Sequence, residues 1–180
     1  MKLMIASDIH GSARFCGELL DAFRREGADR LLLLGDLLYH GPRNDLPEAY
    51  APKEVLAMLN DRGRDLLCVR GNCDTEVDQM VLQFPILADY ALVVMEDIRL
   101  YATHGHIYHR DHLPPLQPGD ILLHGHTHIP LWEKLDTHWI LNPGSVTIPK
   151  ADSPHSYMTL ENRCFRWKTL DGETWHTLTI

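Results

Sequence analysis

Three histidines stand at alternate positions in the segment ILLHGHTHIP, residues 121–130: His124, His126 and His128. Alternate residues of an extended chain point to the same face, so all three imidazoles could approach one point. Imidazole nitrogens bind transition metals and also titrate near neutral pH. The segment is therefore compatible with a metal site, a pH-sensitive patch or the solvated end of a strand, and residues elsewhere in the chain must decide among these.

Polar side chains of the same kinds follow four other apolar runs. They stand in the segments DIH at 8–10, GD at 35–36, GNCD at 71–74 and HGH at 104–106. Acids, amides and imidazoles at the carboxyl ends of parallel strands gather at the edge of the sheet where α/β proteins bind ligands. Each segment alone is better explained as a turn or a helix cap. Five in succession predict a shared metal or catalytic site.

The elements that must position these residues alternate between strand and helix in the first half of the chain. Buried strands are predicted from apolar runs at 2–8, 28–36 and 65–72, and helices from 3.6-residue periodicity and end signals at 12–27, 52–63 and 75–84. This order implies parallel strands joined by right-handed crossovers.

After Pro85 the pattern changes to strands without intervening helices. A hairpin is predicted over 91–105 with its turn at Glu96–Asp97, and further strands at 120–125, 131–145, 156–160, 163–169 and 173–180, with a turn at Asp171–Gly172 between the last two. No repeat or linker interrupts the chain, so we expect one α/β domain over residues 1–180.

Composition limits the function classes. A chain of 180 residues with 44% hydrophobic residues can bury a core without disulfides, and its formal charge of −8 disfavours a nucleic-acid groove or an anionic membrane as partner. None of the four cysteines forms a C-x-x-C pair, which excludes a zinc knuckle. Asp8 follows the N-terminus too closely for a signal-peptide core, and no apolar run has the length of a membrane span, so we expect a cytoplasmic protein.

The ordered motifs resemble those of the calcineurin-like metallophosphoesterases. They are D-x-H, G-D, G-N-x-D, H-G-H and G-H-T-H, starting at Asp8 and followed by NPGS at 142–145. The segments YHGPRN at 39–44 and RGNCD at 70–74 add a likeness to the small bacterial YfcE-type phosphodiesterases of that superfamily. The resemblance implies an α/β fold, a four-layer αββα sandwich of two mixed sheets flanked by helices, with a binuclear metal centre at the strand ends.

The resemblance also implies a ligand set. One metal would be held by Asp8, His10, Asp36 and His128, and the other by Asp36, Asn72, His104 and His126, with Asp36 as the bridge. A carboxylate can offer one oxygen to each of two ions about 3.5–4 Å apart. Imidazole, carboxylate and amide ligands without thiolate suit Mn²⁺, which we expect first, or Zn²⁺, Fe²⁺, Co²⁺ or Ni²⁺, rather than Ca²⁺. His124 has no ligand role in the family pattern, so we expect a strand residue or a hydrogen-bond partner there.

The implied reaction is attack on phosphorus by hydroxide formed at the two metals, with Asp36, Asn72 and His104 as catalytic residues. Many relatives carry histidine as the general acid where this chain has Cys73. A thiol is a weak hydrogen-bond donor, so Cys73 is either a poor acid or a small space-filling residue. The proton could then come from His106 or from solvent, or the leaving group could depart without one.

Three further expectations concern supporting residues and substrate. Asp74 should cap the following helix or accept an N–H from a ligand, with capping favoured. Arg43 and Asn44 could contact phosphate oxygens of a small phosphate ester. A phosphodiester is the first expectation, with phosphomonoesters or nucleotides as the alternative. A non-catalytic scaffold on the same fold is the rival, but all seven ligand positions hold competent residues. A homo-oligomer stays open.

Overall fold

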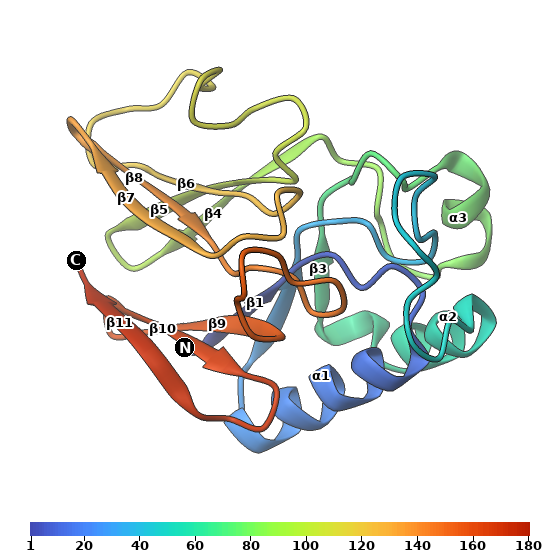
Figure 1. Ribbon diagram of the computed structural model, residues 1–180. Coiled ribbons are helices and arrows are strands. Elements are labelled where there is room, and N and C mark those ends of the chain that lie inside the picture. Colours follow the sequence, from blue (N-terminus) through green and yellow to red (C-terminus); the bar gives the residue numbers. More distant parts are fainter.

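The computed structural model describes all residues 1–180 and stacks two β-sheets face to face (Figure 1). One sheet contains β1 (Leu3–Ala6), β2 (Arg30–Leu33), β3 (Leu66–Cys68), β9 (Ser156–Glu161), β10 (Cys164–Thr169) and β11 (Thr174–Thr179). The other contains β4 (Tyr90–Met95), β5 (Ile98–Thr103), β6 (Ile121–Leu123), β7 (Leu131–Leu135) and β8 (His138–Asn142). The strand orders are β11-β10-β9-β1-β2-β3 and β4-β5-β6-β8-β7.

Both sheets are mixed, as predicted. The β1, β2 and β3 strands pair in parallel, while β9 joins β1 from the other side in antiparallel register. In the second sheet β5, β6 and β8 are parallel, and β4 and β7 close the two edges in antiparallel pairs. The predicted hairpin forms between β4 and β5, with Met95 opposite Ile98 and the turn at Glu96–Asp97.

All three predicted helices form, but the second and third end two to three residues earlier than predicted. They are α1 (Ala13–Glu26), α2 (Pro52–Asp61) and α3 (Glu76–Val81), with a short 3₁₀ turn at Gly63–Asp65. The Ser12 side chain accepts the N–H of Phe15 at the start of α1, and Gly27 ends that helix with a φ of 58°. None of the helices combines the length and the apolar character that a membrane span requires.

Apolar side chains divide into three layers. The largest group packs α1 and α2 against one face of the six-stranded sheet, and a second group, including the buried Trp167, fills the space between the sheets. The outer face of the five-stranded sheet is covered by the loop 104–120, whose Leu113 and Leu116 pack on Leu122 and Ile140. Figure 1 shows this loop (yellow) on one side of the molecule and α1 on the other, so one outer layer is helical and the other is a loop.

The loops that follow β1, β2, β3, β5 and β6 meet at one end of the stacked sheets. Backbone hydrogen bonds fasten them to one another: the Asp8 N–H donates to Gly35 O (3.1 Å), and the His10 N–H donates to Asp36 O (2.9 Å). The Gly125 N–H donates to His104 O at 2.7 Å and joins the loops of the second sheet. This junction positions the side chains that the sequence singled out.

Candidate metal centre

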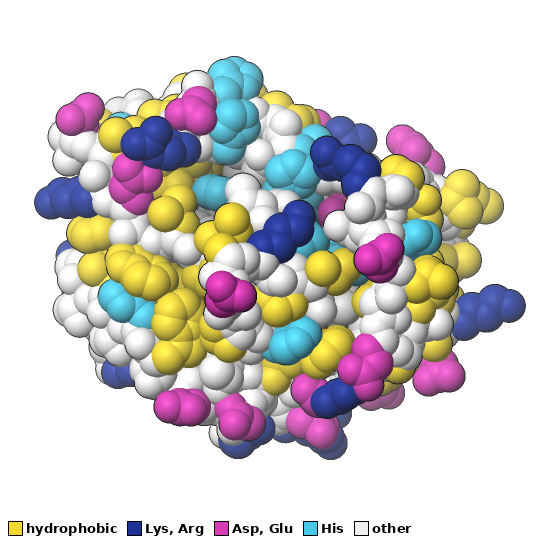
Figure 2. All heavy atoms as spheres, in the orientation of Figure 1, with side chains coloured by type: hydrophobic (Ala, Val, Ile, Leu, Met, Phe, Trp, Pro, Cys, Tyr) yellow, Lys and Arg dark blue, Asp and Glu magenta, His cyan; other side chains and the backbone are white.

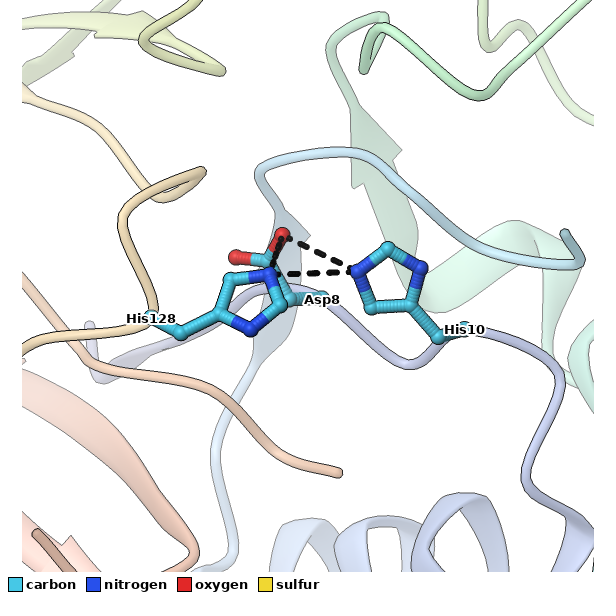
Figure 3. A group of neighbouring side chains, drawn as sticks. All are labelled: Asp8, His10 and His128. Atoms are coloured by element: carbon cyan, nitrogen blue, oxygen red, sulfur yellow. Dashed lines mark hydrogen bonds and ion pairs between the residues drawn. The ribbon is translucent and has the colours of Figure 1, made fainter. Parts of the chain in front are cut away.

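Asp8, His10 and His128 form the first group of ligand atoms (Figure 3). Asp8 Oδ1 lies 3.2 Å from His128 Nε2 and 3.6 Å from His10 Nε2. The two imidazole Nε2 atoms lie 3.2 Å from each other. Three ligand atoms from the loop after β1 and from the loop after β6 therefore point at a common position.

Asp36 lies between this group and a second one. Its Oδ2 atom is 3.7 Å from His10 Nε2 and 3.4 Å from His104 Nε2. Asn72 Oδ1 lies 3.0 Å from His104 Nε2, and His126 Nδ1 lies 3.2 Å from the same nitrogen. The structure thus brings all seven predicted ligands together, with the Asp36 carboxylate between the two groups.

Hydrogen bonds to backbone carbonyls orient three of the imidazole rings. The Nδ1 atoms of His10, His104 and His128 contact the carbonyl oxygens of Tyr39 (2.8 Å), Leu34 (2.6 Å) and Ile148 (2.7 Å). A neutral imidazole that donates from Nδ1 carries its lone pair on Nε2, and metal-binding histidines are held in this way. In all three rings the nitrogen that faces the centre is consequently the one free to bind a cation.

Backbone strain is concentrated at the same positions. Five of the seven residues adopt a left-handed conformation: Asp8 (φ 63°), His10 (48°), Asp36 (56°), His126 (64°) and His128 (61°). A residue other than glycine is disfavoured in this region by roughly 1 kcal/mol or more, and such residues cluster at functional sites. The left-handed conformation is thus found at five residues whose side chains belong to the centre.

The electrostatics of the centre favour a cation. Asp8 is fully buried and Asp36 is 2% exposed, so two carboxylates lie close together with little exposure to solvent. Burial would raise the pKa of Asp8, but His10 and His128 hold that pKa well below its ordinary value. For His104 the directions are reversed. Burial would lower the pKa of this imidazole, but the neighbouring Asp36 and Asp8 carboxylates raise it to about 9.

The donor set fits divalent transition metals. Asp8 Oδ1 is buried and accepts no hydrogen bond, while Asp8 Oδ2 accepts the His126 N–H at 3.1 Å. Burial, with a contribution from His104, lowers the pKa of His126 to about 4 and keeps that imidazole neutral. An unsatisfied carboxylate oxygen beside inward-facing imidazole nitrogens is the environment that Mn²⁺, Fe²⁺ or Zn²⁺ would complete.

Asp74 supports the centre in a way that differs from the prediction. The expected helix cap is wrong, because Thr75 caps α3 and exchanges hydrogen bonds with Asp78. Asp74 turns back instead: its Oδ2 accepts the N–H groups of Asp36 and Gly71, both at 2.8 Å, and its Oδ1 accepts that of Leu37 at 2.9 Å. The less favoured alternative, an N–H accepted from a ligand residue, is the one observed.

Cys73 belongs to the wall of the centre. Its backbone N–H donates to Asp36 Oδ1 at 2.8 Å, and its Sγ accepts from Asn72 Nδ2 at 3.3 Å. Burial, followed by the charge of Asp36, raises the pKa of the Cys73 thiol. The thiol therefore stays protonated and is a weak acid. His106 lies farther out, with its ring centroid 5.4 Å from that of His104.

The opening segment divides its three histidines between two roles. His126 and His128 face the centre, whereas His124 is buried behind them beside the Gly125 carbonyl (3.1 Å) and Asn142 Nδ2 (3.3 Å). Asn142 also donates to Gly125 O at 2.8 Å, so this pair shapes the turn that carries His126. This agrees with the expected supporting role for His124.

The NPGS segment fastens the loop after β1. Ser145 Oγ donates to the carbonyl of Asp8 (3.1 Å), and Thr147 Oγ1 donates to that of Ile9 (2.7 Å). The motif was visible in the sequence, but its contacts with the Asp8 loop were not. Periodicity gives no information on contacts across more than a hundred residues.

A cavity of about 340 Å³ opens over the centre. It is lined by predicted residues from the metal centre, by Cys73 and by both predicted substrate residues. Four further lining residues were missed or left unassigned from the sequence: Gly41, Pro42, Thr127 and Lys150. Arg43 and Lys150 bring two positive charges to the cavity, whereas Asn44 Nδ2 donates to His40 O (2.8 Å) and holds the loop. Lys150 had no motif around it that could have identified it.

Comparisons with known proteins agree with this geometry. A family model described as the calcineurin-like phosphoesterase superfamily domain matches residues 1–163. The phosphodiesterase YfcE of Escherichia coli strain K12 is 51% identical over 162 residues, which cover 90% of this chain and 88% of that protein. A probable metallophosphoesterase of Methanothermobacter thermautotrophicus is 29% identical over 182 residues, covering 96% of this chain and 88% of that one.

Solved structures extend the comparison. The structure of Yfce, a phosphoesterase from E. coli, superposes with a TM-score of 0.97 at 47% identity and covers all of both chains. Wild-type Vps29 from Entamoeba histolytica, complexed with zinc, superposes with a TM-score of 0.63 at 22% identity, covering 99% of this chain and 98% of that one. At that identity the second likeness concerns the fold alone.

Proposed function

Because the chain belongs to the calcineurin-like phosphoesterase superfamily, a family of metal-dependent hydrolases, we propose that it hydrolyses small phosphodiesters with two bound divalent cations. The phosphodiesterase name of the 51% identical E. coli relative supports the choice of a diester. The observation that carries the proposal is the convergence of two groups of ligand atoms on either side of Asp36.

The proposed ligands are those of the sequence prediction. Asp8, His10, Asp36 and His128 would hold one ion, and Asp36, Asn72, His104 and His126 the other, with Mn²⁺ first and Zn²⁺, Fe²⁺, Co²⁺ or Ni²⁺ as alternatives. When bound, the pair of ions would supply hydroxide near neutral pH and offset charge on the phosphate oxygens.

The remaining residues of the cavity would bind and orient the ester. Arg43 and Lys150 would attract the phosphate, and the guanidinium can bind two oxygens at once. Asp74 would keep the Asp36 loop in place through its three backbone hydrogen bonds. The centre would then be preorganised before substrate enters.

The leaving oxygen must receive a proton. With its raised pKa, the Cys73 thiol would supply it poorly, so His106 or solvent would be the donor. His106 Nδ1 is buried without a hydrogen-bond partner, and the His106 ring lies next to that of His104, with 5.4 Å between the ring centroids. This arrangement would favour esters whose leaving groups are already acidic.

Phosphomonoesters or nucleotides are the second candidate. The two cations Arg43 and Lys150 could balance the additional charge of a monoester. A non-catalytic scaffold fits less well, because no ligand position is lost from the centre. The net charge of −8 supports a small ester over a long polyanion.

Protein loaded with Mn²⁺ should be assayed against a panel of diesters, monoesters and nucleotides, with His104→Ala as the control. We expect the highest kcat/KM on a diester and no activity in the control. Equal activity of wild type and His104→Ala would assign the hydrolysis to another site or to a contaminant. Metal uptake without hydrolysis of any ester would favour the scaffold.

A further inference from the structure

A second pocket, of about 470 Å³, borders the cavity over the metal centre. The two share His126 and Thr127, which form the partition between them. The pocket lies between the loops that follow β5 and β6, and Ile129, Pro130 and Leu131 give it an apolar wall. Figure 2 shows histidine side chains (cyan) coming to the surface on the upper part of the face drawn there.

Two imidazole nitrogens of this pocket have no hydrogen-bond partner. They are Nε2 of His124, a residue 3% exposed, and Nδ1 of His106. A buried polar atom without a partner costs roughly 1–3 kcal/mol, so native proteins rarely leave one unsatisfied. Both atoms are enclosed by the protein, so a ligand would find its hydrogen-bonding partners among the accessible polar side chains of the lining, which include His109 and Thr127.

The pocket offers no free cation. Its one arginine, Arg110, binds the Glu133 carboxylate through two hydrogen bonds of 2.8 and 2.9 Å, and also lies 3.4 Å from Asp111 Oδ1. The neighbouring cavity, in contrast, contains Arg43 and Lys150. The pocket therefore suits an uncharged group. With that group beside His106, the departing oxygen would lie outside the pocket and take its proton from solvent, the alternative donor.

We propose that this pocket binds the arm of a phosphodiester that remains on phosphorus, and that this arm is an uncharged, hydrogen-bonding group about the size of a nucleoside. The assignment rests on the proposed diesterase function. A volume of about 470 Å³ lies within the range of small-molecule sites. In the reaction, water supplies its oxygen to phosphorus, the bond to the other alcohol breaks, and that alcohol leaves with one proton. The product in the pocket is a phosphomonoester.

The test compares two esters with the same leaving group. Methyl p-nitrophenyl phosphate has a minimal retained arm, and the p-nitrophenyl ester of thymidine 5′-monophosphate has a large uncharged one. For the Mn²⁺-loaded wild type we expect kcat/KM to be at least about tenfold higher for the thymidine ester, mainly through KM. Ile129→Trp should fill the pocket and reduce this ratio to about one, and Ile129→Phe should reduce it partly.

Val77→Trp is the matched control. Val77 is 69% exposed and lines a separate apolar groove on the other side of Cys73, whereas Ile129 is 42% exposed. The ratio should be unchanged in this variant. A wild-type ratio near one, a ratio that persists in both Ile129 variants, or a ratio lost in Val77→Trp would each overturn the assignment. Failure of wild type to hydrolyse either ester would refute the diesterase function itself, and the assignment with it.

Discussion

Asp36 is the residue on which both halves of the centre depend. Its Oδ1 accepts the Cys73 N–H, its Oδ2 lies between His10 and His104, and its backbone has a φ of 56°. A neutral amide at this position keeps the shape but removes the negative charge that two cations would share. The centre should then lose affinity for metal without losing its fold.

Asp36→Asn should lower kcat/KM by more than the 10–100-fold that supporting residues of a metal site typically contribute. It should also abolish the rise in Tm that Mn²⁺ produces by binding the native state. Metal-free Asp36→Asn should be less stable than metal-free wild type, because His104 loses its buried carboxylate partner. Differential scanning calorimetry of both proteins, with and without Mn²⁺, measures all four Tm values. A Tm rise equal to that of wild type would contradict the bridging role.

Cys73 governs a second prediction at the residue scale. Since its thiol has a raised pKa and is a weak donor, Cys73→Ser should retain activity within about tenfold of wild type. Rates across aryl and alkyl phosphodiesters should fall steeply as the pKa of the leaving group rises. A flat dependence, or a loss in Cys73→Ser as complete as in Asp36→Asn, would show that the thiol is an efficient acid.

Single residues were predictable where a motif contained them. The meeting of the seven proposed ligands could be predicted because each stands in a motif at the end of an apolar run, and Arg43 stands in the loop between two of them. Lys150 and the turned-back carboxylate of Asp74 were not predictable, because tertiary contacts alone place them. Local rules favoured Asp74 as a helix cap. In the structure its carboxylate instead accepts the buried N–H groups of the Asp36 loop, which would cost free energy if they were left without an acceptor.

At the scale of elements, the centre depends on close approach between strand-end loops. A Cβ on Gly71 would lie 2.1 Å from Asp36 Oδ1 and 2.3 Å from its backbone nitrogen. The loop after β3 can therefore support the loop after β2 only when residue 71 lacks a side chain.

Gly71→Ala should displace Asp36, weaken Mn²⁺ binding and destabilise the protein by about 1–3 kcal/mol, as overpacking typically does. The matched control is Gly17→Ala within α1, where a Cβ would meet nothing within 4 Å. That change should leave metal binding intact and stabilise the helix by about 0.5–1 kcal/mol. Urea unfolding and Mn²⁺ titration of the two variants provide the comparison, and equal effects of both would contradict the steric explanation.

The existence and type of the elements followed from periodicity, while their partners did not. Apolar runs and caps such as Ser12 and Gly27 located the strands and α1 closely. No local signal indicated that β9 returns to pair with β1, where Leu3 lies opposite Leu160, and so extends the first sheet. The sequence pattern also did not indicate that a loop covers the outer face of the second sheet, because Leu113 and Leu116 follow no regular period.

At the scale of the whole molecule, Glu26 links both ends of the chain. It ends α1 and accepts bonds from Lys2, Lys168 and the Tyr157 hydroxyl (2.8 Å). Burial would raise the pKa of Glu26, but the two lysines and the hydroxyl hold it at about 2, below its ordinary value of 4.5. A carboxylate with a depressed pKa stabilises the fold fully above its unfolded pKa and loses that contribution as the pH falls through the folded one.

Glu26→Gln should lower the free energy of unfolding by roughly 1.5–3 kcal/mol at pH 7. The difference from wild type should shrink as the pH falls from 4.5 towards 2, the interval between the two pKa values. Glu18→Gln is the control, because Glu18 pairs with Arg14 on the exposed side of the same helix and should contribute less than about 0.5 kcal/mol. Urea denaturation at several pH values would contradict the prediction if the Glu26 effect did not vary with pH.

The most direct measurement of the centre is anomalous scattering from crystals soaked in Mn²⁺. Two peaks about 3.5–4 Å apart should appear on either side of the Asp36 carboxylate, one against Asp8, His10 and His128 and the other against Asn72, His104 and His126. No peak at this position, or a single ion that leaves either set of side chains without metal, would contradict a two-metal hydrolase.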